Sequence, residues 1–148
     1  MIDKDLFHLQ PSMTAAVRGF LNDVRYEAKH NHQVKVPHLF VAEGLRSYTR
    51  QNYLYAKRPR VTYAKGGKSY HNFGLAVDVY PLVGGTDQVD WDFNPKTPGW
   101  KRILQLAEKN GLNWGGHWYR LKDYPHFELK KKPFLWQCRK KWPKGWEV

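Results

Sequence analysis

The chain has 148 residues, and its 25 Lys and Arg against 13 Asp and Glu give a formal net charge of +12. This length favours one domain with a core of its own, and 41% hydrophobic and 16% aromatic residues exclude a wholly disordered chain. No segment approaches the ~18 apolar residues of a membrane span, and the single cysteine, Cys138, excludes an intrachain disulfide and a cysteine-based zinc site.

The N-terminal sequence MIDKDLFHLQPSM lacks the basic start and the apolar core of a secretory signal peptide. We therefore expect the protein to be made in the cytoplasm and, if it works outside, to need another route of release. The excess of positive charge requires an anionic partner. Nucleic acid, an anionic membrane surface and an anionic cell wall all satisfy that requirement.

Apolar periodicity and chain breakers predict alternating helices and strands. Apolar residues recur every four positions from Ala16 to Ala28, which predicts a helix over residues 12–30 with Ser12 as its N-cap. The other expected elements are a strand at 37–43, a helix that Ser47 caps and that stops before Pro59, a basic loop at 57–68, a strand at 74–80, a loop at 81–99, a helix at 99–110 that ends at Gly111, and strands at 112–114 and 126–129. This order favours a compact α+β fold with a small antiparallel sheet flanked by helices.

The last 19 residues, 130–148, differ from the rest in composition. They hold seven basic residues and one acid, which is half of the net charge, with Trp136, Trp142 and Trp146 interleaved. The segment is too short for an independent wall-binding domain, so we read 1–148 as a single domain. The segment has three possible roles: a solvated tail, an envelope-binding element or a part of the fold. We favour a mixture of the last two, because exposing three tryptophans to water costs free energy.

The first motif that carries chemistry runs from Ser69 to Asp78 and reads SYHNFGLAVD. His71 lies at the end of a glycine-containing loop, and Asp78 lies within an otherwise apolar strand. A buried, unpaired carboxylate is costly. A metal ion shared with His71 would satisfy it.

The second motif is DYPHFE, in which Asp123 precedes His126 by three residues. With His71 and Asp78, His126 completes two histidines and one carboxylate. Catalytic zinc uses three-ligand sets of this kind and keeps a fourth position for water. Asp123 is the candidate general base for that water.

The third motif, GLRSYTRQ, places Arg46 just past the end of a predicted strand. A fixed guanidinium there could stabilise the oxyanion of a tetrahedral intermediate. Pairing with Glu43, or capping of a helix, is the alternative for Arg46.

Together the three motifs resemble the VanY-type zinc peptidases of bacterial cell-wall metabolism. The pattern S-x-H-x-x-G-x-A-x-D, followed by a distal acid-x-x-H, is complete in this chain. The block WGGHW followed by KDYPHFE is similar to the branch that contains L-alanyl-D-glutamate endopeptidases, including many bacteriophage endolysins. The resemblance covers roughly residues 36–129.

The resemblance implies a D,D-peptidase-like (Hedgehog-type) fold with zinc in an open groove. It implies that Zn²⁺ is bound by His71, Asp78 and His126, with Asp123 as catalytic base and Arg46 as oxyanion stabiliser. The substrate cleft would be lined by Ser69, Gln51, Trp114 and Trp118. The chain departs from the family in one position, since the family carries an acid where this WGGHW block has His117.

The function implied by the resemblance is zinc-dependent cleavage of the L-alanyl-D-glutamate bond in peptidoglycan stem peptides. A monomeric phage endolysin, released through a holin pore and held on anionic envelope polymers or lipid by its basic segments, fits these features. The alternative on the same scaffold is a D-alanyl-D-alanine carboxypeptidase. A non-enzymatic binder of nucleic acid is an alternative of another class, but it gives no reason for the ordered His, Asp, Asp, His set.

The remaining histidines and tryptophans are expected to be structural. Four histidines match no motif and are expected at the surface, where the His30-x-His32 spacing could hold an adventitious metal: His8, His30, His32 and His38. Trp91 and Trp100 are expected in the core, and Cys138 is expected to be inert.

Overall fold

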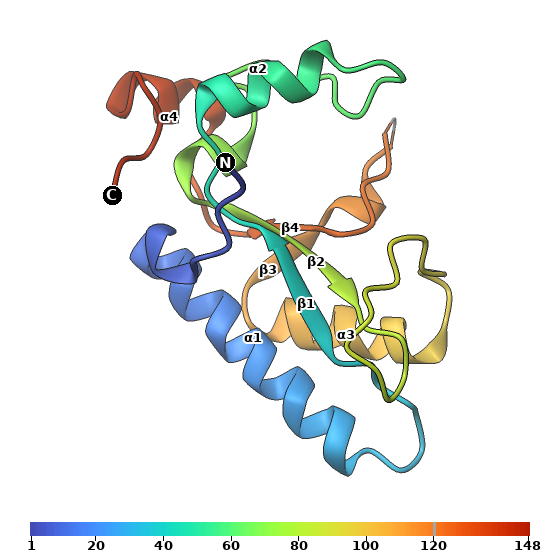
Figure 1. The fold of residues 1–148 in the computed structure, drawn as a ribbon. Helices are drawn as coiled ribbons and strands as arrows, with labels where there is room; N and C mark the ends of the chain where they lie inside the picture. Colours follow the sequence, from blue (N-terminus) through green and yellow to red (C-terminus); the bar gives the residue numbers. More distant parts are fainter. Residues whose placement is uncertain (120) are drawn as a thin grey trace.

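The computed structural model describes residues 1–119 and 121–148 and has the expected α+β architecture (Figure 1). Its α-helices are α1 (Pro11–His30), α2 (Tyr48–Ala56), α3 (Pro98–Lys109) and α4 (Leu135–Lys141). Its strands are β1 (Leu39–Glu43), β2 (Ala76–Pro81), β3 (Leu112–Trp114) and β4 (His126–Leu129). Short 3-10 helices are η1 (Leu6–His8), η2 (Tyr70–Phe73) and η3 (Gly115–His117).

The four strands form one antiparallel sheet in the order β1-β2-β4-β3. Because side chains alternate between the two faces of a strand, Val77 and Val79 point to one face and Asp78 to the other. The register pairs Asp78 of β2 directly with His126 of β4. The sheet therefore brings these two polar side chains together on the same face.

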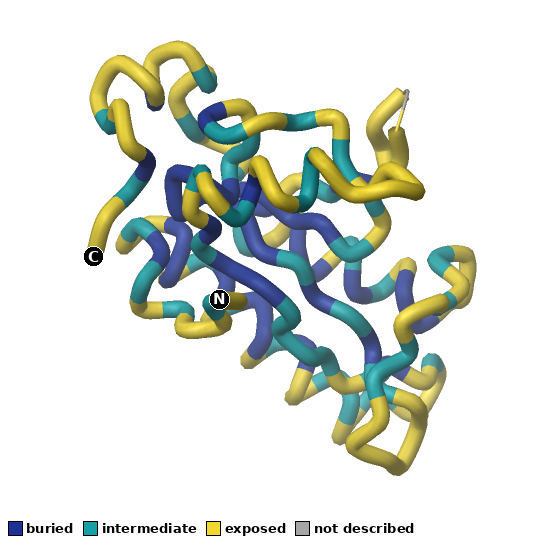
Figure 2. The backbone as a smooth tube through the Cα atoms, turned by 45° about the horizontal axis from the view of Figure 1, so that its top comes forward, coloured by how far each residue is buried: buried dark blue, intermediate teal, exposed yellow. Residues whose placement is uncertain are grey.

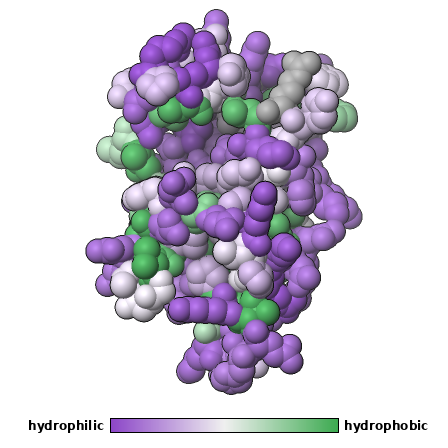
Figure 3. Space-filling view, turned by 90° about the vertical axis from the view of Figure 1, so that its right-hand side faces the viewer, coloured by the Kyte–Doolittle hydropathy of each residue, from purple (hydrophilic) through white to green (hydrophobic). Residues whose placement is uncertain are grey.

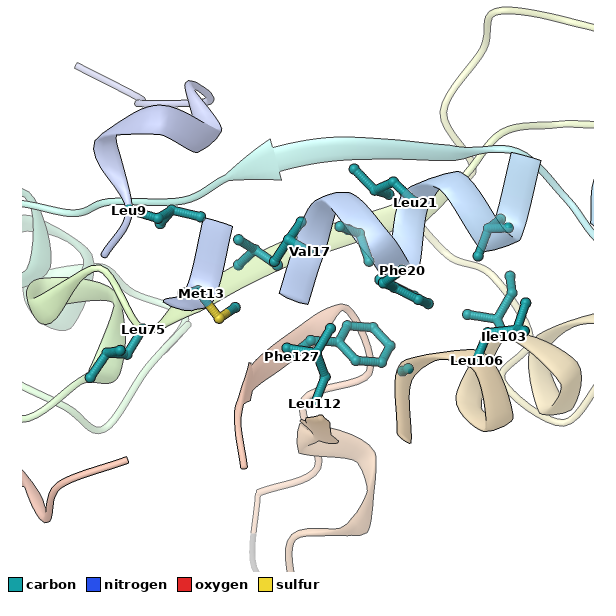
Figure 4. Packing of buried hydrophobic residues seen from close by; sticks show 14 of the residues in the cluster. Leu9, Met13, Val17, Phe20, Leu21, Leu75, Ile103, Leu106, Leu112 and Phe127 are labelled. Atoms are coloured by element: carbon teal, nitrogen blue, oxygen red, sulfur yellow. The ribbon is translucent and has the colours of Figure 1, made fainter. Parts of the chain in front are cut away.

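Helices α1 and α3 cover the apolar face of the sheet. In Figure 4, Val17 and Phe20 of α1 and Ile103 of α3 point toward Phe127 of β4, and all four side chains are fully buried. The rings of Phe20 and Phe127 lie 5.4 Å apart. Burial of side chains of this size contributes about 1.5–3 kcal/mol each, so this layer fixes the sheet whose other face carries the polar residues.

The opposite face of the sheet lies under α2 and the loops that flank it. Figure 1 shows α2 above the sheet, with the segment between β3 and β4 standing beside it. The tube in Figure 2 is buried along the central strands and exposed along these outer loops. The polar face of the sheet therefore lies beneath α2 and these loops.

The first residues of two helices differ from the prediction, and one predicted N-cap is confirmed. Helix α1 begins at Pro11 with Gln10 as N-cap, so the prediction of Ser12 as N-cap is wrong: proline is pre-set for the first helical turn. Helix α3 likewise begins at Pro98, where the Thr97 side chain accepts from the Trp100 amide. The predicted cap at Ser47 is confirmed, since its side chain accepts from the Arg50 amide.

The C-terminal segment contains a helix, α4, that the sequence reading did not predict. Cys138 of α4 is fully buried, and the ring of Trp142 lies 6.4 Å from that of Phe73. The indole of Trp146 donates to the His8 carbonyl (3.1 Å), and its amide donates to the Asn72 carbonyl (2.9 Å). Much of the basic segment is therefore packed onto the fold.

Two tryptophans expected in the core behave differently. Trp100 is 1% exposed, as predicted, but Trp91 is 62% exposed, and its prediction as a core residue is wrong. The ring of Trp91 instead covers that of Tyr80 from the loop before α3, at 4.8 Å between centroids. Among the described residues, no helix has both the length and the apolar character to cross a membrane.

Candidate active site

Three predicted ligands meet on the polar face of the sheet. One ligand atom from each of His71, Asp78 and His126 lies within 4.8 Å of the other two. Both histidines are almost fully buried, and their rings are 5.0 Å apart. The cluster joins η2, β2 and β4, so it depends on the tertiary fold and not on one local motif.

The local chain at η2 orients His71. The Ser69 side chain caps η2 by accepting from the His71 amide (3.3 Å). The ring Nδ1 lies 2.7 Å from the Gly44 carbonyl, which only accepts hydrogen bonds, so Nδ1 carries the proton. Nε2 is thereby left with its lone pair and faces Oδ1 of Asp78 at 3.2 Å.

A second carboxylate orients His126 from the other side. Nε2 of His126 lies 3.0 Å from Oε1 of Glu128, two residues along β4 on the same face. Lys132 holds the other oxygen of Glu128 at 2.7 Å. Nδ1 of His126 is then directed at Asp78, 3.5 Å away. Metal-bound histidines characteristically have such a partner on the distal nitrogen.

The electrostatics of the cluster favour a cation. Burial opposes ionisation of Asp78, yet its interactions with His71 and His126 hold the pKa of its carboxyl well below its usual range. Burial alone would lower the pKa of His126, but the hydrogen bonds that its ring donates to Asp78 and Glu128 raise it to about 9. Two imidazole nitrogens and one carboxylate oxygen form a donor set that suits Zn²⁺. The residues present therefore fit the metal that the resemblance implies.

Arg46 contacts the same cluster through Asp78. Its Nη2 donates to Oδ2 of Asp78 (3.1 Å) and to Glu43 (2.7 Å), and Glu43 also accepts from Arg50 (2.9 Å). Nη1 donates to the Gln51 amide oxygen (3.0 Å), while Nε is buried without a partner. The guanidinium is therefore fixed at the cavity wall, with its charge beside Asp78.

The structure places Gln51 behind Arg46 and away from the cavity. Its side chain is fully buried and donates to the Ala64 carbonyl at 2.7 Å. Gln51 is absent from the lining of the cavity over the cluster. The prediction that it lines the substrate cleft is therefore corrected: Gln51 positions Arg46 and the chain at Ala64.

Asp123 lies at the edge of the cluster. Its Oδ2 is 4.0 Å from Nδ1 of His126, and its side chain is 41% exposed. Partial burial and the negative charge of Asp78 raise the pKa of its carboxyl. A Cβ at Gly115 would come within 2.6 Å of the Asp123 carbonyl and 3.0 Å of the His126 Cβ, so this glycine permits the close approach of the two segments.

A cavity of about 680 Å³ opens over the cluster. Ser69 and Trp118 line it as predicted, and the ring of Trp118 lies 4.8 Å from that of His126. Figure 3 shows the molecule hollowed near its upper end, where hydrophobic residues lie beneath a hydrophilic rim. The size and mixed lining are those of a small-molecule or peptide site.

Of the WGGHW block only Trp118 is in that cavity lining, which corrects the prediction for Trp114. The indole of Trp114 donates to the Tyr124 carbonyl (2.6 Å) and so braces the turn before His126. His117 is exposed and packs against Trp114 at 5.0 Å between ring centroids. The departure from the family at this position therefore lies away from the three ligands.

Two acidic residues support the cluster, and the sequence predicted only part of their roles. Glu128 stands in the quoted DYPHFE motif but received no role, although its spacing of two from His126 on a strand implies the same face. Pairing of Arg46 with Glu43, given above as an alternative for Arg46, is present at 2.7 Å, and the additional contact of Glu43 with Arg50 was not predicted. Of the unassigned histidines, His30, His32 and His38 are exposed, as expected.

This fold is that of the D,D-peptidase-like class of proteins. Residues 62–129 match the sequence family described as D-alanyl-D-alanine carboxypeptidase. This segment is therefore similar to that peptidase family, and the resemblance inferred from the three motifs is confirmed.

Two curated relatives share part of the chain. The peptidoglycan L-alanyl-D-glutamate endopeptidase CwlK of Bacillus subtilis is 41% identical over 100 residues, which cover 60% of this chain and 59% of that protein. The L-alanyl-D-glutamate peptidase of Listeria phage A118 is 34% identical over 67 residues, which cover 45% of this chain and 23% of that protein. The matches span less than two thirds of either relative.

Solved structures show the same fold over most of the chain. The L-Ala D-Glu endopeptidase ChiX of Serratia marcescens matches with a TM-score of 0.59 and 29% identity, covering 84% of this chain and 82% of that one. The VanY D,D-pentapeptidase of a VanB-type resistance cassette, solved in complex with Zn(II), matches with a TM-score of 0.54 and 14% identity, covering 90% and 76%. The predicted D,D-peptidase-like fold is thus confirmed.

Proposed function

We propose that this protein is a zinc-dependent peptidoglycan endopeptidase that cleaves the L-alanyl-D-glutamate bond of stem peptides. The observation that carries the proposal is the convergence of His71, Asp78 and His126 beneath an open cavity, with Asp123 at its edge. The Bacillus and Serratia proteins, which are named for this activity, support the choice of bond.

The three ligands would hold Zn²⁺ through Nε2 of His71, a carboxylate oxygen of Asp78 and Nδ1 of His126. When bound, zinc supplies Lewis-acid chemistry that polarises a carbonyl and lowers the pKa of water. Asp123 takes the proton of the attacking water and delivers it to the departing amine of D-glutamate. Its partial exposure lets it reach both water and substrate.

Arg46 has two roles in this proposal. Its contact with Oδ2 of Asp78 positions the ligand carboxylate, and its charge at the cavity wall stabilises the developing oxyanion. Glu43 and Gln51 hold the guanidinium in place, which supplies the preorganisation that such stabilisation needs.

A second candidate is a D-alanyl-D-alanine carboxypeptidase, because the matched family is described by that activity. The two reactions use the same hydrolytic chemistry but cleave different bonds. The endopeptidase releases the amine of D-glutamate, whereas the carboxypeptidase releases the C-terminal D-alanine. The relatives with 41% and 29% identity are both named as endopeptidases, which favours the first candidate.

The setting of the activity is the bacterial envelope in this proposal. The Listeria phage relative supports a role as a phage endolysin. Release through a holin pore is a further part of this proposal. Exposed bases on the 57–68 loop and on α4 would hold the monomeric enzyme on anionic polymers or lipid of the envelope. Nucleic acid is not a partner in this account, since it leaves the His-Asp-His cluster unexplained.

A soluble stem pentapeptide, L-alanyl-γ-D-glutamyl-diaminopimelyl-D-alanyl-D-alanine, provides the first test. The protein should release alanine from its amino end, stop after chelation and recover with Zn²⁺. Release of only the C-terminal D-alanine would support the carboxypeptidase instead. No hydrolysis by protein with a full equivalent of zinc would refute both.

A further inference from the structure

A second cavity, of about 980 Å³, continues from the candidate active site to α4. It shares six lining residues with the cavity over the metal ligands: Thr62, Ala64, Lys68, Trp118, Leu121 and Leu135. Three residues line only the α4 end: Tyr63, Trp136 and Arg139. Trp136 and Arg139 lie on α4, outside the segment that matches the peptidase family.

The walls of this α4 cavity combine aromatic faces with positive charge. Trp136 is 58% exposed and Trp118 is 38% exposed, so both offer ring surface to a ligand. Lys68 and Arg139 supply two cations, and none of the lining residues that the structure describes is acidic. Such walls favour a ligand with carboxylates and aliphatic carbon.

The two cations are available to an anion. Nη1 of Arg139 donates to the Gly67 carbonyl (3.0 Å), which fixes the side chain without neutralising it. Within residues 1–119 and 121–148, neither Lys68 nor Arg139 forms an ion pair with a carboxylate. Cavity walls with cations and no counter-charge attract anionic groups and raise their local concentration.

We infer that the α4 cavity binds the anionic half of the stem peptide that leaves with D-glutamate. This inference rests on the proposed endopeptidase function. The half on the alanine side is joined to the glycan and carries no carboxylate. The leaving half has the free α-carboxylate of γ-linked D-glutamate, the carboxylate and alkyl chain of the diamino acid and the terminal carboxylate of D-alanine, which match Lys68, Arg139 and the aromatic walls.

Binding of the leaving fragment tests this inference without requiring turnover. The probe is γ-D-glutamyl-diaminopimelyl-D-alanine, titrated calorimetrically into zinc-loaded protein. Lys68→Gln should weaken its affinity about fivefold, as loss of one partly exposed charge contact predicts. Trp136→Ala should weaken it about tenfold or more, since an aromatic wall is lost.

Matched controls lie on the same helix and segment. Lys140→Gln removes an exposed charge of α4, and Phe134→Ala removes an exposed ring, 68% accessible, beside it; neither residue lines the cavity. Both should bind the fragment as the wild type does. Circular dichroism and the midpoint of thermal unfolding verify that every variant is folded.

Two results would overturn the inference. One is equal affinity for the fragment in the wild type, Lys68→Gln and Trp136→Ala. The other is undiminished affinity for the fragment with all its carboxylates amidated, or tighter binding of diacetylchitobiose, which would assign the cavity to glycan. Failure of the proposed function would give a different result. The protein would then hydrolyse no stem peptide, although it still bound the fragment in a way that depends on Lys68 and Trp136.

Discussion

Nε2 of His126 lies 3.0 Å from a carboxylate oxygen of Glu128, and this contact decides which nitrogen of the ring faces Asp78. Lys132 fixes the same carboxylate from the other side at 2.7 Å. The ring of His126 is therefore held in one orientation before any metal arrives. Glu128 is thus a positioning residue for the proposed zinc site.

Replacing Glu128 should weaken zinc binding without removing a ligand. We expect Glu128→Ala to raise the Kd for Zn²⁺ about 10- to 100-fold, because the distal partner of the ligand histidine is lost. Glu128→Gln keeps an acceptor oxygen and should recover part of that loss. Competition with a zinc-binding dye measures the Kd, and Glu147→Gln, at an exposed position, is the control. An unchanged Kd in Glu128→Ala would contradict the role.

Loss of His71 should remove the metal and the activity together. His71→Ala leaves two of the three ligands. Loss of a direct ligand should weaken zinc affinity by roughly 10²-fold or more. We therefore expect less than about one tenth of an equivalent of zinc to remain after dialysis. Elemental analysis measures the content. His38→Ala, at an exposed histidine, should retain zinc and full activity. A His71→Ala protein with normal metal content and turnover would refute the site.

Replacing Asp123 should separate chemistry from metal binding. Asp123→Asn keeps the size of the side chain but removes the proton acceptor, so kcat should fall about 10²- to 10⁴-fold. Zinc content should stay at one equivalent, because Asp123 is not among the three clustered ligands. If the metal content falls together with kcat, Asp123 acts as a ligand and the assignment as base is wrong.

Gln51 should act on stability through Arg46. Gln51→Ala leaves Nη1 of Arg46 and the Ala64 carbonyl without their partner in a buried place, which costs about 1–3 kcal/mol of unfolding free energy. Urea unfolding measures this cost. Gln51→Glu keeps the acceptor for Arg46 and is expected to restore part of the stability. If Gln51→Ala has normal stability and only its KM is raised, Gln51 would instead be assigned to substrate binding, as the sequence predicted.

The C-terminal segment should be required for folding as well as for retention on the envelope. Trp146→Ala removes a packed ring and its hydrogen bond to His8, and we expect a loss of roughly 2–3 kcal/mol in unfolding free energy. Trp136→Ala, at an exposed ring, is the matched control and should leave stability nearly unchanged. Equal unfolding midpoints for the wild type and Trp146→Ala would show that the segment is a solvated tail.

Local patterns were enough to predict which two histidines and which aspartate cluster, and to predict most helices and strands. His71 and His126 are preceded by Ser69 and Asp123, which form local turns, and Asp78 is the one acid in an apolar strand. The antiparallel register that pairs Asp78 with His126 then follows from the sheet. The resemblance to the peptidase family then indicated that the three motifs, in this order along the chain, form one site.

Contacts between distant segments account for the errors. Gln51 lies on a short helix whose pattern does not show which face is buried, and its partners are Arg46 and Ala64. Trp91 packs across a long loop onto Tyr80 and so remains exposed. Helix α4 is short and basic, and it depends on burial of Cys138 against the core. The local sequence does not indicate that Cys138 is buried.

Digestion of purified peptidoglycan, followed by mass spectrometry of the soluble and insoluble products, tests the central claim most directly. The account predicts new amino termini on D-glutamate and new carboxyl termini on L-alanine, with both absent when a chelator is present and restored by Zn²⁺. Release of free D-alanine with L-alanyl-D-glutamate bonds and cross-links intact would contradict it.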